Sequence, residues 1–324
     1  MAFSLFAIFA SPSFGEIRES SYARFPAGKC LNIEDIDRLD ESDIQVLLLD
    51  LKNANVVSVR LPFHIDEHKS RDQASGLIDE YYVDSIKDKA LAFAKSGVTV
   101  VLDAHSINDI YGSEATTETL SSYWIELAKK LRYLPKNVYF ELLNEPKSSI
   151  NLNFYLSSYE KAVREIRKID NNRVLIVGSP WYSHYKGLSK LKVLNDYNII
   201  YTFHYYDPME FTHQNASWLP RYRGIKASYG ESTDVKRLKE ARVEVRKFIQ
   251  ATGRTPFLGE FGVIKYAAAS ERNEYIRDVS SVFSSLEIQG CLWSWTKEGG
   301  AFSIKNGVHL DENIMTNFKT PSVR

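Results

Sequence analysis

The stretch YYVDSIKDKALAFAKSGVTVVLDAH, residues 81–105, contains a helical pattern followed directly by a strand pattern. In Tyr81–Ser96, apolar residues recur at three- and four-residue spacing with charged residues opposite them, which predicts an amphipathic helix. Gly97 stands where a helix C-terminal glycine belongs. Val98–His105 is an apolar, β-branched run of strand length with polar residues at its end. The stretch therefore predicts one helix and one buried strand of a parallel α/β sheet.

The same alternation continues in both directions along the chain. Further buried strands are predicted at Val56–Pro62, Val138–Glu145, Arg173–Pro180, Ile199–Tyr206, Thr255–Gly262 and Gly290–Thr296. Further amphipathic helices are predicted at Leu120–Leu134, Tyr155–Ile169, Val235–Thr252 and Glu271–Leu286. Because strand and helix alternate strictly, we expect a parallel sheet with right-handed crossovers, and the near-continuous apolar strands imply that the sheet is buried on both faces.

We interpret Phe3–Phe9 as the first of eight strands, because this aromatic run is short enough for a buried strand. The alternative for MAFSLFAIFASPSFG, residues 1–15, is a signal peptide, which lacks the usual positively charged n-region here. No linker or composition shift divides the chain. The sequence therefore predicts an α/β fold, a single catalytic (β/α)₈ TIM barrel over residues 1–324.

Composition excludes several classes of function. Lys+Arg and Asp+Glu both total 41, and no dense run of one sign occurs, so a nucleic-acid partner is not expected. The longest apolar runs are well short of the roughly 20 residues of a membrane span. Cys30 and Cys291 form no CxxC pattern, so we expect two buried free thiols rather than a disulfide or a zinc site.

Polar and aromatic residues stand at the ends of most predicted strands, where barrels of this kind place their catalytic groups. These strand ends are Arg60, Asp103-Ala104-His105, Asn144-Glu145-Pro146, His204-Tyr205-Tyr206, Gly259-Glu260-Phe261-Gly262 and Trp293-Ser294-Trp295. Residues two apart on a strand share a face, so His204 and Tyr206 point the same way. Any one of these residues alone is more simply a structural group; their coincidence predicts a site.

Glu145 and Glu260 meet the needs of glycosidic cleavage, which takes one protonated and one ionised carboxyl group. We predict Glu145 as general acid/base and Glu260 as nucleophile. A carboxyl separation of about 5–5.5 Å would make the enzyme retaining, and this chemistry needs no metal or cofactor. We expect Asn144 to bind a sugar hydroxyl, and Arg60 and Tyr206 to hold Glu260.

Other residues allow more than one interpretation. Glu141 shares the face of Glu145 but lies deeper, which favours a structural role inside the barrel. Trp181 is either a sugar-stacking platform or a rim aromatic. The irregular stretch from Asp207 to about Thr233 carries Phe211, His213, Gln214, Trp218 and Tyr222, and a long loop after a strand usually shapes a binding site.

The ordered segments VRLP, LDAH, FELLNEP, HYYDP, LGEFG and LWSW resemble glycoside hydrolase family 5, which includes many bacterial cellulases. The resemblance runs from Val59 to Trp295 and implies the same roles for Glu145 and Glu260. It implies substrate binding by Arg60, His105, Asn144, His204, Tyr206 and Trp293. FTHQNASW, residues 211–218, is similar to a segment that would bring His213, Gln214 and Trp218 near the sugar, with Asn215 where glycine is usual.

One departure from the family concerns the first strand. The family commonly has glycine and asparagine there, whereas the predicted strand lies in FSLFAIFASPS, residues 3–13. The contacts that this strand usually supplies are therefore not accounted for. Only the resemblance favours Trp293 over Trp295 as the sugar platform, because the two share a strand face.

The predicted function is hydrolysis of a β-linked glucan, most simply as an endo-β-1,4-glucanase on a polysaccharide or oligosaccharide. A β-1,3-glucanase, a β-mannanase and a glycolipid glycosidase remain alternatives, since loops decide the substrate. A noncatalytic carbohydrate-binding barrel would have lost one carboxylate, and a metal-dependent isomerase would need more converging ligands. We expect a monomer, secreted or periplasmic because polymeric substrates lie outside cells.

Overall fold

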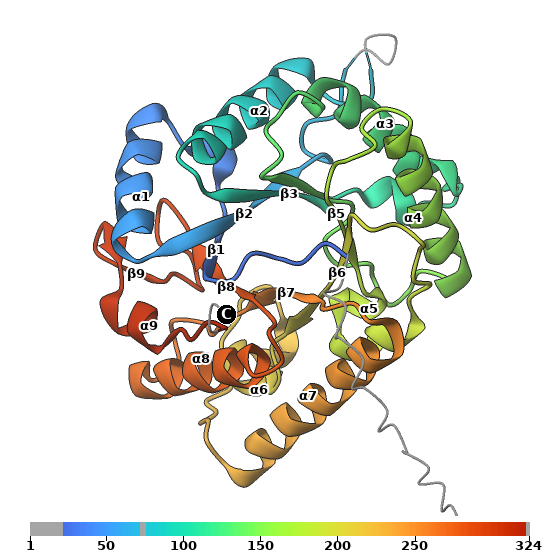
Figure 1. Ribbon diagram of the computed structural model, residues 1–324. Helices are drawn as coiled ribbons and strands as arrows, with labels where there is room; N and C mark the ends of the chain where they lie inside the picture. The colour runs from blue at the N-terminus through green and yellow to red at the C-terminus, as the bar shows by residue number, and fades with distance from the viewer. Residues whose placement is uncertain (1–21, 72–75, 322–324) are drawn as a thin grey trace, which may run out of the picture.

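The computed structural model describes residues 22–71 and 76–321. Within them, eight parallel strands close into a barrel in sequence order (Figure 1). The strands are β1 (Lys29–Ile33), β2 (Val56–His64), β3 (Thr99–Ser106), β4 (Val138–Glu141), β5 (Leu175–Gly178), β6 (Ile199–Tyr205), β7 (Phe257–Phe261) and β8 (Gly290–Trp295). The predicted (β/α)₈ barrel is confirmed.

Helices surround the barrel (Figure 1). They are α1 (Glu41–Asn53), α2 (Glu80–Lys95), α3 (Glu118–Leu131), α4 (Leu152–Arg167), α7 (Ser232–Thr252), α8 (Ala269–Ser284) and α9 (Glu312–Asn317). The loops carry the short turns α5 (Pro180–Ser183), α6 (Met209–Thr212), η1 (Ile36–Arg38), η2 (Asn108–Tyr111), η3 (Tyr185–Lys190) and η4 (Pro220–Tyr222), and a hairpin of β9 (Lys305–Asn306) and β10 (His309–Leu310). No described helix is long and apolar enough to cross a membrane.

The position predicted for the first strand was wrong. Phe3–Phe9 lies outside the described residues, and its place between β8 and β2 is taken by β1. The short sequence KCLNI begins with a lysine and carries an asparagine at its fourth position, so it contains no long apolar run. In the barrel, the Asn32 amide donates to the carbonyl oxygens of Gly259 (3.1 Å) and Cys291 (3.3 Å). Burial of Asn32 therefore leaves its amide satisfied, which only the closed sheet provides.

The barrel interior is layered. Its lower layer is apolar and is formed by Cys30, Val101, Ile176, Ile200, Phe257 and Cys291. Phe25 stacks on Phe257 from below, with 3.8 Å between ring centroids. Two residues further along β1, β2, β3 and β4, the inward positions are polar and fully buried: Asn32, Arg60, Asp103 and Glu141. Since inward residues alternate along a strand, the apolar layer supports a polar layer beneath the catalytic end.

The expectation of two free thiols was also wrong. Cys30 and Cys291 are joined in a disulfide, with their Cα atoms 4.3 Å apart. They lie opposite each other where β1 pairs with β8. The two positions are 261 residues apart in sequence, so only closure of the barrel between its first and last strands brings them together.

Candidate active site

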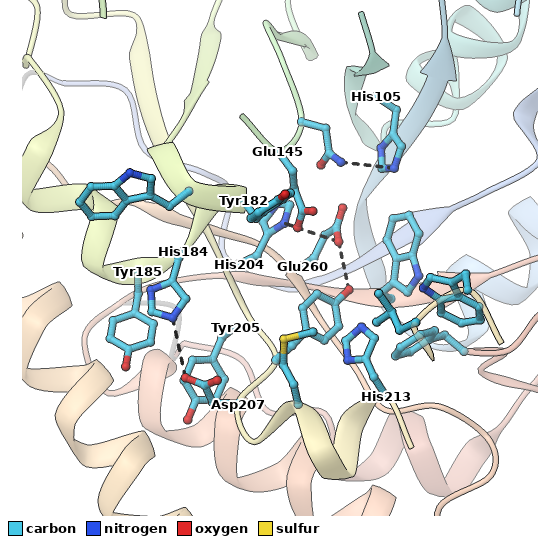
Figure 2. A pocket seen from close by; sticks show the side chains of 18 of the residues that line it. His105, Glu145, Tyr182, His184, Tyr185, His204, Tyr205, Asp207, His213 and Glu260 are labelled. Carbon is cyan, nitrogen blue, oxygen red and sulfur yellow. Dashed lines mark hydrogen bonds and ion pairs between the residues drawn. The ribbon is translucent and has the colours of Figure 1, made fainter. Parts of the chain in front are cut away.

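A cavity of about 780 Å³ lies at the carboxyl ends of the strands, and Glu145 and Glu260 both line it. Figure 2 shows His184 and Tyr185 on one side of the two glutamates and His213 on the other. The predicted residues His105, Asn144, Trp181, His204, Tyr206, His213, Trp218 and Trp293 also line this cavity. Arg60 and Gln214 are not among its lining residues.

Glu260 is the inward residue near the end of β7 and is only 4% exposed. Its Oε1 accepts a hydrogen bond from Arg60 Nη1 at 2.8 Å, and its Oε2 accepts one from the Tyr206 hydroxyl at 3.0 Å. Gly259 makes room for this arrangement, because a Cβ there would lie 2.9 Å from His204 Nε2. Both carboxylate oxygens are thus held by donors, which fixes the orientation of the group.

Arg60 is fully buried and is the cation at the centre of the polar layer. Its guanidinium pairs with Glu141 (2.7 Å), Asp103 (2.9 Å) and Glu260 (2.8 Å) and also donates to the side-chain oxygens of Asn32 and Asn144. Burial alone would lower the pKa of Arg60, but the three acidic groups together raise it well above its ordinary value. This geometry corrects the predicted substrate contact of Arg60: its donors are engaged by protein groups. The structural role predicted for Glu141 agrees with its burial.

Glu145 follows β4 and has different surroundings. Its Oε1 is 2.8 Å from His204 Nδ1, and its side chain is 30% exposed. Burial raises the pKa of Glu145 to about 7, although His105 and Arg60 act to lower it. Burial also lowers the pKa of His204 to about 4, so that the imidazole is neutral near pH 7. Glu145 therefore remains substantially protonated at neutral pH, as a general acid must.

A second histidine is held in place between the polar layer and the cavity. His105 Nδ1 lies 2.6 Å from Asp103 Oδ2, and His105 Nε2 lies 3.3 Å from Asn144 Nδ2. The imidazole stacks on Trp293, with centroids 5.6 Å apart and planes 15° from parallel. Asn144, which also lines the cavity, is thereby oriented by Arg60 and His105.

Aromatic groups lie on both sides of the two glutamates. Trp293, Trp218 and Phe302 line the cavity on the side of His213, whose ring packs edge-on against Tyr206 and Phe302. Trp181, Tyr182 and Tyr185 also line it, and Tyr185 stacks on His184 on the opposite side (Figure 2). Trp293 faces the cavity, whereas Trp295 is buried in the core at 5% exposure. The structure thus separates two tryptophans that the strand pattern left equivalent.

The predicted sugar contact of Gln214 is corrected by the structure. The side chain is only 4% exposed, and its amide donates to the carbonyl oxygens of Phe211 (3.1 Å) and Ala227 (3.0 Å). The residue therefore stabilises the loop that carries His213 and Trp218. Met209 at the start of the short helix α6 and His213 directly after it line the cavity.

Glu34 is a cavity residue that the sequence did not reveal. It directly follows β1, and its carboxylate accepts a hydrogen bond from the Ser294 hydroxyl. Burial raises the pKa of Glu34 to about 7; the Ser294 bond opposes that rise and the charges of Asp35 and Glu260 add to it. A strand assigned to Lys29–Ile33 would have revealed Glu34, because it would then stand at a strand end like Glu145 and Glu260.

Glu145, His204 and Glu260 each offer one ligand atom within 4.8 Å of the others, so this trio is also where a metal ion would find ligands among the described residues. A carboxylate oxygen of Glu145 therefore lies within 4.8 Å of a carboxylate oxygen of Glu260. The carboxyl groups of retaining glycosidases are about 5–5.5 Å apart, whereas inverting enzymes need a wider gap for water. The fold and this pair of carboxyl groups define a barrel glycoside hydrolase.

The chain belongs to glycosyl hydrolase family 5. Residues 35–299 match the family model described as cellulase. Endoglucanase C of Acetivibrio thermocellus is 28% identical over 300 residues, which cover 80% of this chain and 84% of the relative. Endoglucanase H of A. thermocellus is 26% identical over 234 residues, 71% of this chain, and this chain spans only 25% of that longer relative.

Solved structures share the whole barrel. A hyperthermophilic endo-β-1,4-glucanase in complex with substrate superposes with a TM-score of 0.80 at 25% identity, covering 90% of this chain and 96% of that one. The similarity therefore extends over nearly all the described residues and includes the predicted catalytic strands.

Proposed function

We propose that this protein is a retaining endo-β-1,4-glucanase in which Glu145 is the acid/base and Glu260 the nucleophile. The observation that carries the proposal is the close approach of two carboxyl groups with opposite surroundings. One oxygen of each lies within 4.8 Å of the other, Arg60 and Tyr206 donate to Glu260, and burial raises the pKa of Glu145 to about 7.

The chemistry follows from these positions in two displacements. In the first, a Glu260 oxygen attacks the anomeric carbon, the glycosidic C–O bond breaks, and the Glu145 proton moves to the leaving oxygen. In the second, Glu145 takes a proton from water, the water oxygen attacks the same carbon, and the bond to Glu260 breaks. Asn144, oriented by Arg60 and His105, supplies an amide to a sugar hydroxyl near the reacting carbon.

The substrate proposal rests on the aromatic side chains on both sides of the glutamates. Sugar rings have apolar faces that stack on aromatic rings, so sugar units on both sides of the cleaved bond find platforms here. Binding on both sides is what internal cleavage of a chain requires. The endoglucanase names of the relatives agree with this proposal.

Product analysis tests the proposal. We expect carboxymethylcellulose to lose viscosity faster than it gains reducing ends, and β-1,3-glucan, mannan and xyloglucan to be cleaved more slowly. Proton NMR of the first products should show the β-anomer. Preferential cleavage of mannan or β-1,3-glucan would replace the substrate, and an initial α-anomer would overturn the mechanism. Complete loss of activity on addition of a chelator would favour metal-dependent chemistry instead.

A secreted or periplasmic location and a monomeric state are part of the same proposal. Polymeric glucans lie outside cells, and a disulfide such as Cys30–Cys291 is typical of oxidising compartments. Cell fractionation and sedimentation analysis test these two points directly.

A further inference from the structure

The turn Trp181–Ser183 has an unusual backbone conformation. Its three consecutive residues have φ angles of 64°, 61° and 52°, in the left-handed region. This region is disfavoured for residues that carry a Cβ atom, and it persists only where surrounding contacts hold the chain. No glycine relieves the turn at these three positions, so its conformation calls for an explanation in what it contacts.

The turn is bonded to the backbone on both sides of Glu145. The Ser183 hydroxyl donates to the carbonyl oxygen of Asn144 at 2.7 Å, and the Tyr182 N–H donates to the carbonyl oxygen of Pro146 at 2.8 Å. The Ser183 side chain is fully buried. Glu145 and Pro146 lie between these two carbonyls along the chain, so the two bonds from one turn hold the peptide unit before Glu145 and the peptide unit after Pro146.

Two glycines allow the turn to come this close. A Cβ at Gly178 would lie 2.9 Å from Ser183 Oγ and 3.1 Å from the Asn144 carbonyl oxygen. A Cβ at Gly187 would lie 2.5 Å from the Pro180 carbonyl oxygen. These distances are shorter than ordinary contacts, so the packing of the turn against the Glu145 loop depends on the missing side chains.

The side chains of the same turn reach the cavity. Trp181 and Tyr182 line it, and Tyr182 is 50% exposed. The turn therefore presents its side chains to the space where a sugar would bind, while its backbone and Ser183 hold the loop of the predicted acid.

We propose that Ser183 and Tyr182 are positioning residues that set the distance between the Glu145 carboxyl group and the leaving oxygen. The inference rests on the proposed role of Glu145. A general acid must come within about 2.6–3.2 Å of the atom it protonates, and a displacement of about 1 Å costs roughly 10²-fold in rate. Loss of the Ser183 bond removes one of the restraints on the Asn144–Pro146 backbone and so impairs protonation, leaving Glu260 and its donors in place.

The experiment compares aryl β-cellobiosides with good and poor leaving groups. Ser183→Ala should lower kcat/KM for the phenyl glycoside by roughly ten- to a hundredfold. For the 2,4-dinitrophenyl glycoside, whose leaving group needs little protonation, the change should be less than about twofold. Ser183→Gly, which suits a φ of 52° and also lacks the hydroxyl, should give the same pattern and guards against misfolding of the alanine variant.

Ser179→Ala is the matched control. Ser179 is a fully buried serine of the same loop whose hydroxyl donates to the His184 carbonyl oxygen at 2.9 Å. Its loss should leave the leaving-group dependence unchanged. An equal fall for both glycosides in Ser183→Ala and Ser183→Gly would overturn the positioning role.

Glu145→Ala separates this inference from the proposed function. It should show the strongest dependence on the leaving group. If Glu145→Ala shows no such dependence, the assignment of the acid fails; if it does while both Ser183 variants match wild type, only the positioning role fails.

Discussion

Glu260 and Glu145 face each other across one cavity, yet their surroundings differ. Glu260 accepts hydrogen bonds from Arg60 and Tyr206 on its two oxygens. Glu145 contacts His204, which is neutral near pH 7 and so offers no positive charge to the carboxyl group. Burial therefore raises the pKa of Glu145 to about 7. Neighbours from other strands thus give one residue type two different environments, as the proposed roles of acid and nucleophile require.

We expect the largest effects from replacing each of the two glutamates in turn. Glu260→Ala should lower kcat on glucans by at least about 10⁴-fold, because no covalent intermediate forms. Glu145→Ala should lower it by about 10²–10⁴-fold. Steady-state assays on cello-oligosaccharides measure both.

Azide then identifies the roles. With an activated aryl glycoside, azide should restore turnover of Glu145→Ala and give the β-glycosyl azide, whereas with Glu260→Ala it should give the α-azide. A 2-fluoro glycoside should label Glu260 in the wild type. A label on Glu145 would contradict the assignment.

Removing the cation beneath Glu260 should destabilise the fold. Arg60→Met leaves Asp103, Glu141 and Glu260 buried without their common partner, so the free energy of unfolding should fall by about 3–5 kcal/mol. Urea denaturation followed by fluorescence measures it. The control Arg237→Met breaks an exposed pair with Glu210 and should cost less than about 1 kcal/mol. Similar losses in the two variants would show that the buried network contributes no more to the free energy of unfolding than an exposed ion pair.

Tyr206→Phe sharpens the comparison by removing one donor from Glu260 alone. A hydrogen bond to a charged group is worth about 1.5–3 kcal/mol, so kcat/KM should fall by roughly ten- to a hundredfold. The pH dependence assigned to Glu145 should remain. An unchanged kcat/KM would mean that Arg60 suffices to hold the nucleophile.

The pH profile tests the other half of the comparison. In the proposed mechanism Glu145 acts when protonated, so kcat/KM should fall as the pH rises through about 7, tending to tenfold per pH unit above it. The pKa of Glu34 is also raised to about 7, so Glu34→Gln is the necessary control. The fall in kcat/KM above pH 7 should persist in that variant. Its disappearance would assign the titration to Glu34.

The smallest expected effect concerns the aromatic wall away from both glutamates. Trp218 is 53% exposed and lines the cavity, so Trp218→Ala should raise KM on oligosaccharides by roughly two- to twelvefold, equivalent to about 0.5–1.5 kcal/mol. The free energy of unfolding should change by less than about 0.5 kcal/mol. A loss of several kcal/mol would instead make Trp218 a core residue.

The sequence by itself determined the barrel and the strand ends. Seven predicted strands correspond to β2–β8, because long apolar runs must be buried on both faces of a parallel sheet. Glu145 and Glu260 stand at the carboxyl ends of such runs, so their meeting at one end of the barrel could be predicted. The asparagine-containing β1 gave no comparable pattern, and Glu34 was missed with it.

Only the tertiary structure decided which groups bond to each other. Residues distant in sequence are joined by the disulfide between Cys30 and Cys291 and by the pairing of Arg60 with three acidic groups. The burial of Gln214 likewise depends on the path of the loop that carries it. Their partners depend on strand register and loop path, which closure of the barrel fixes. Sequence periodicity reports which face a residue takes, and it carries no information on which residue will lie opposite.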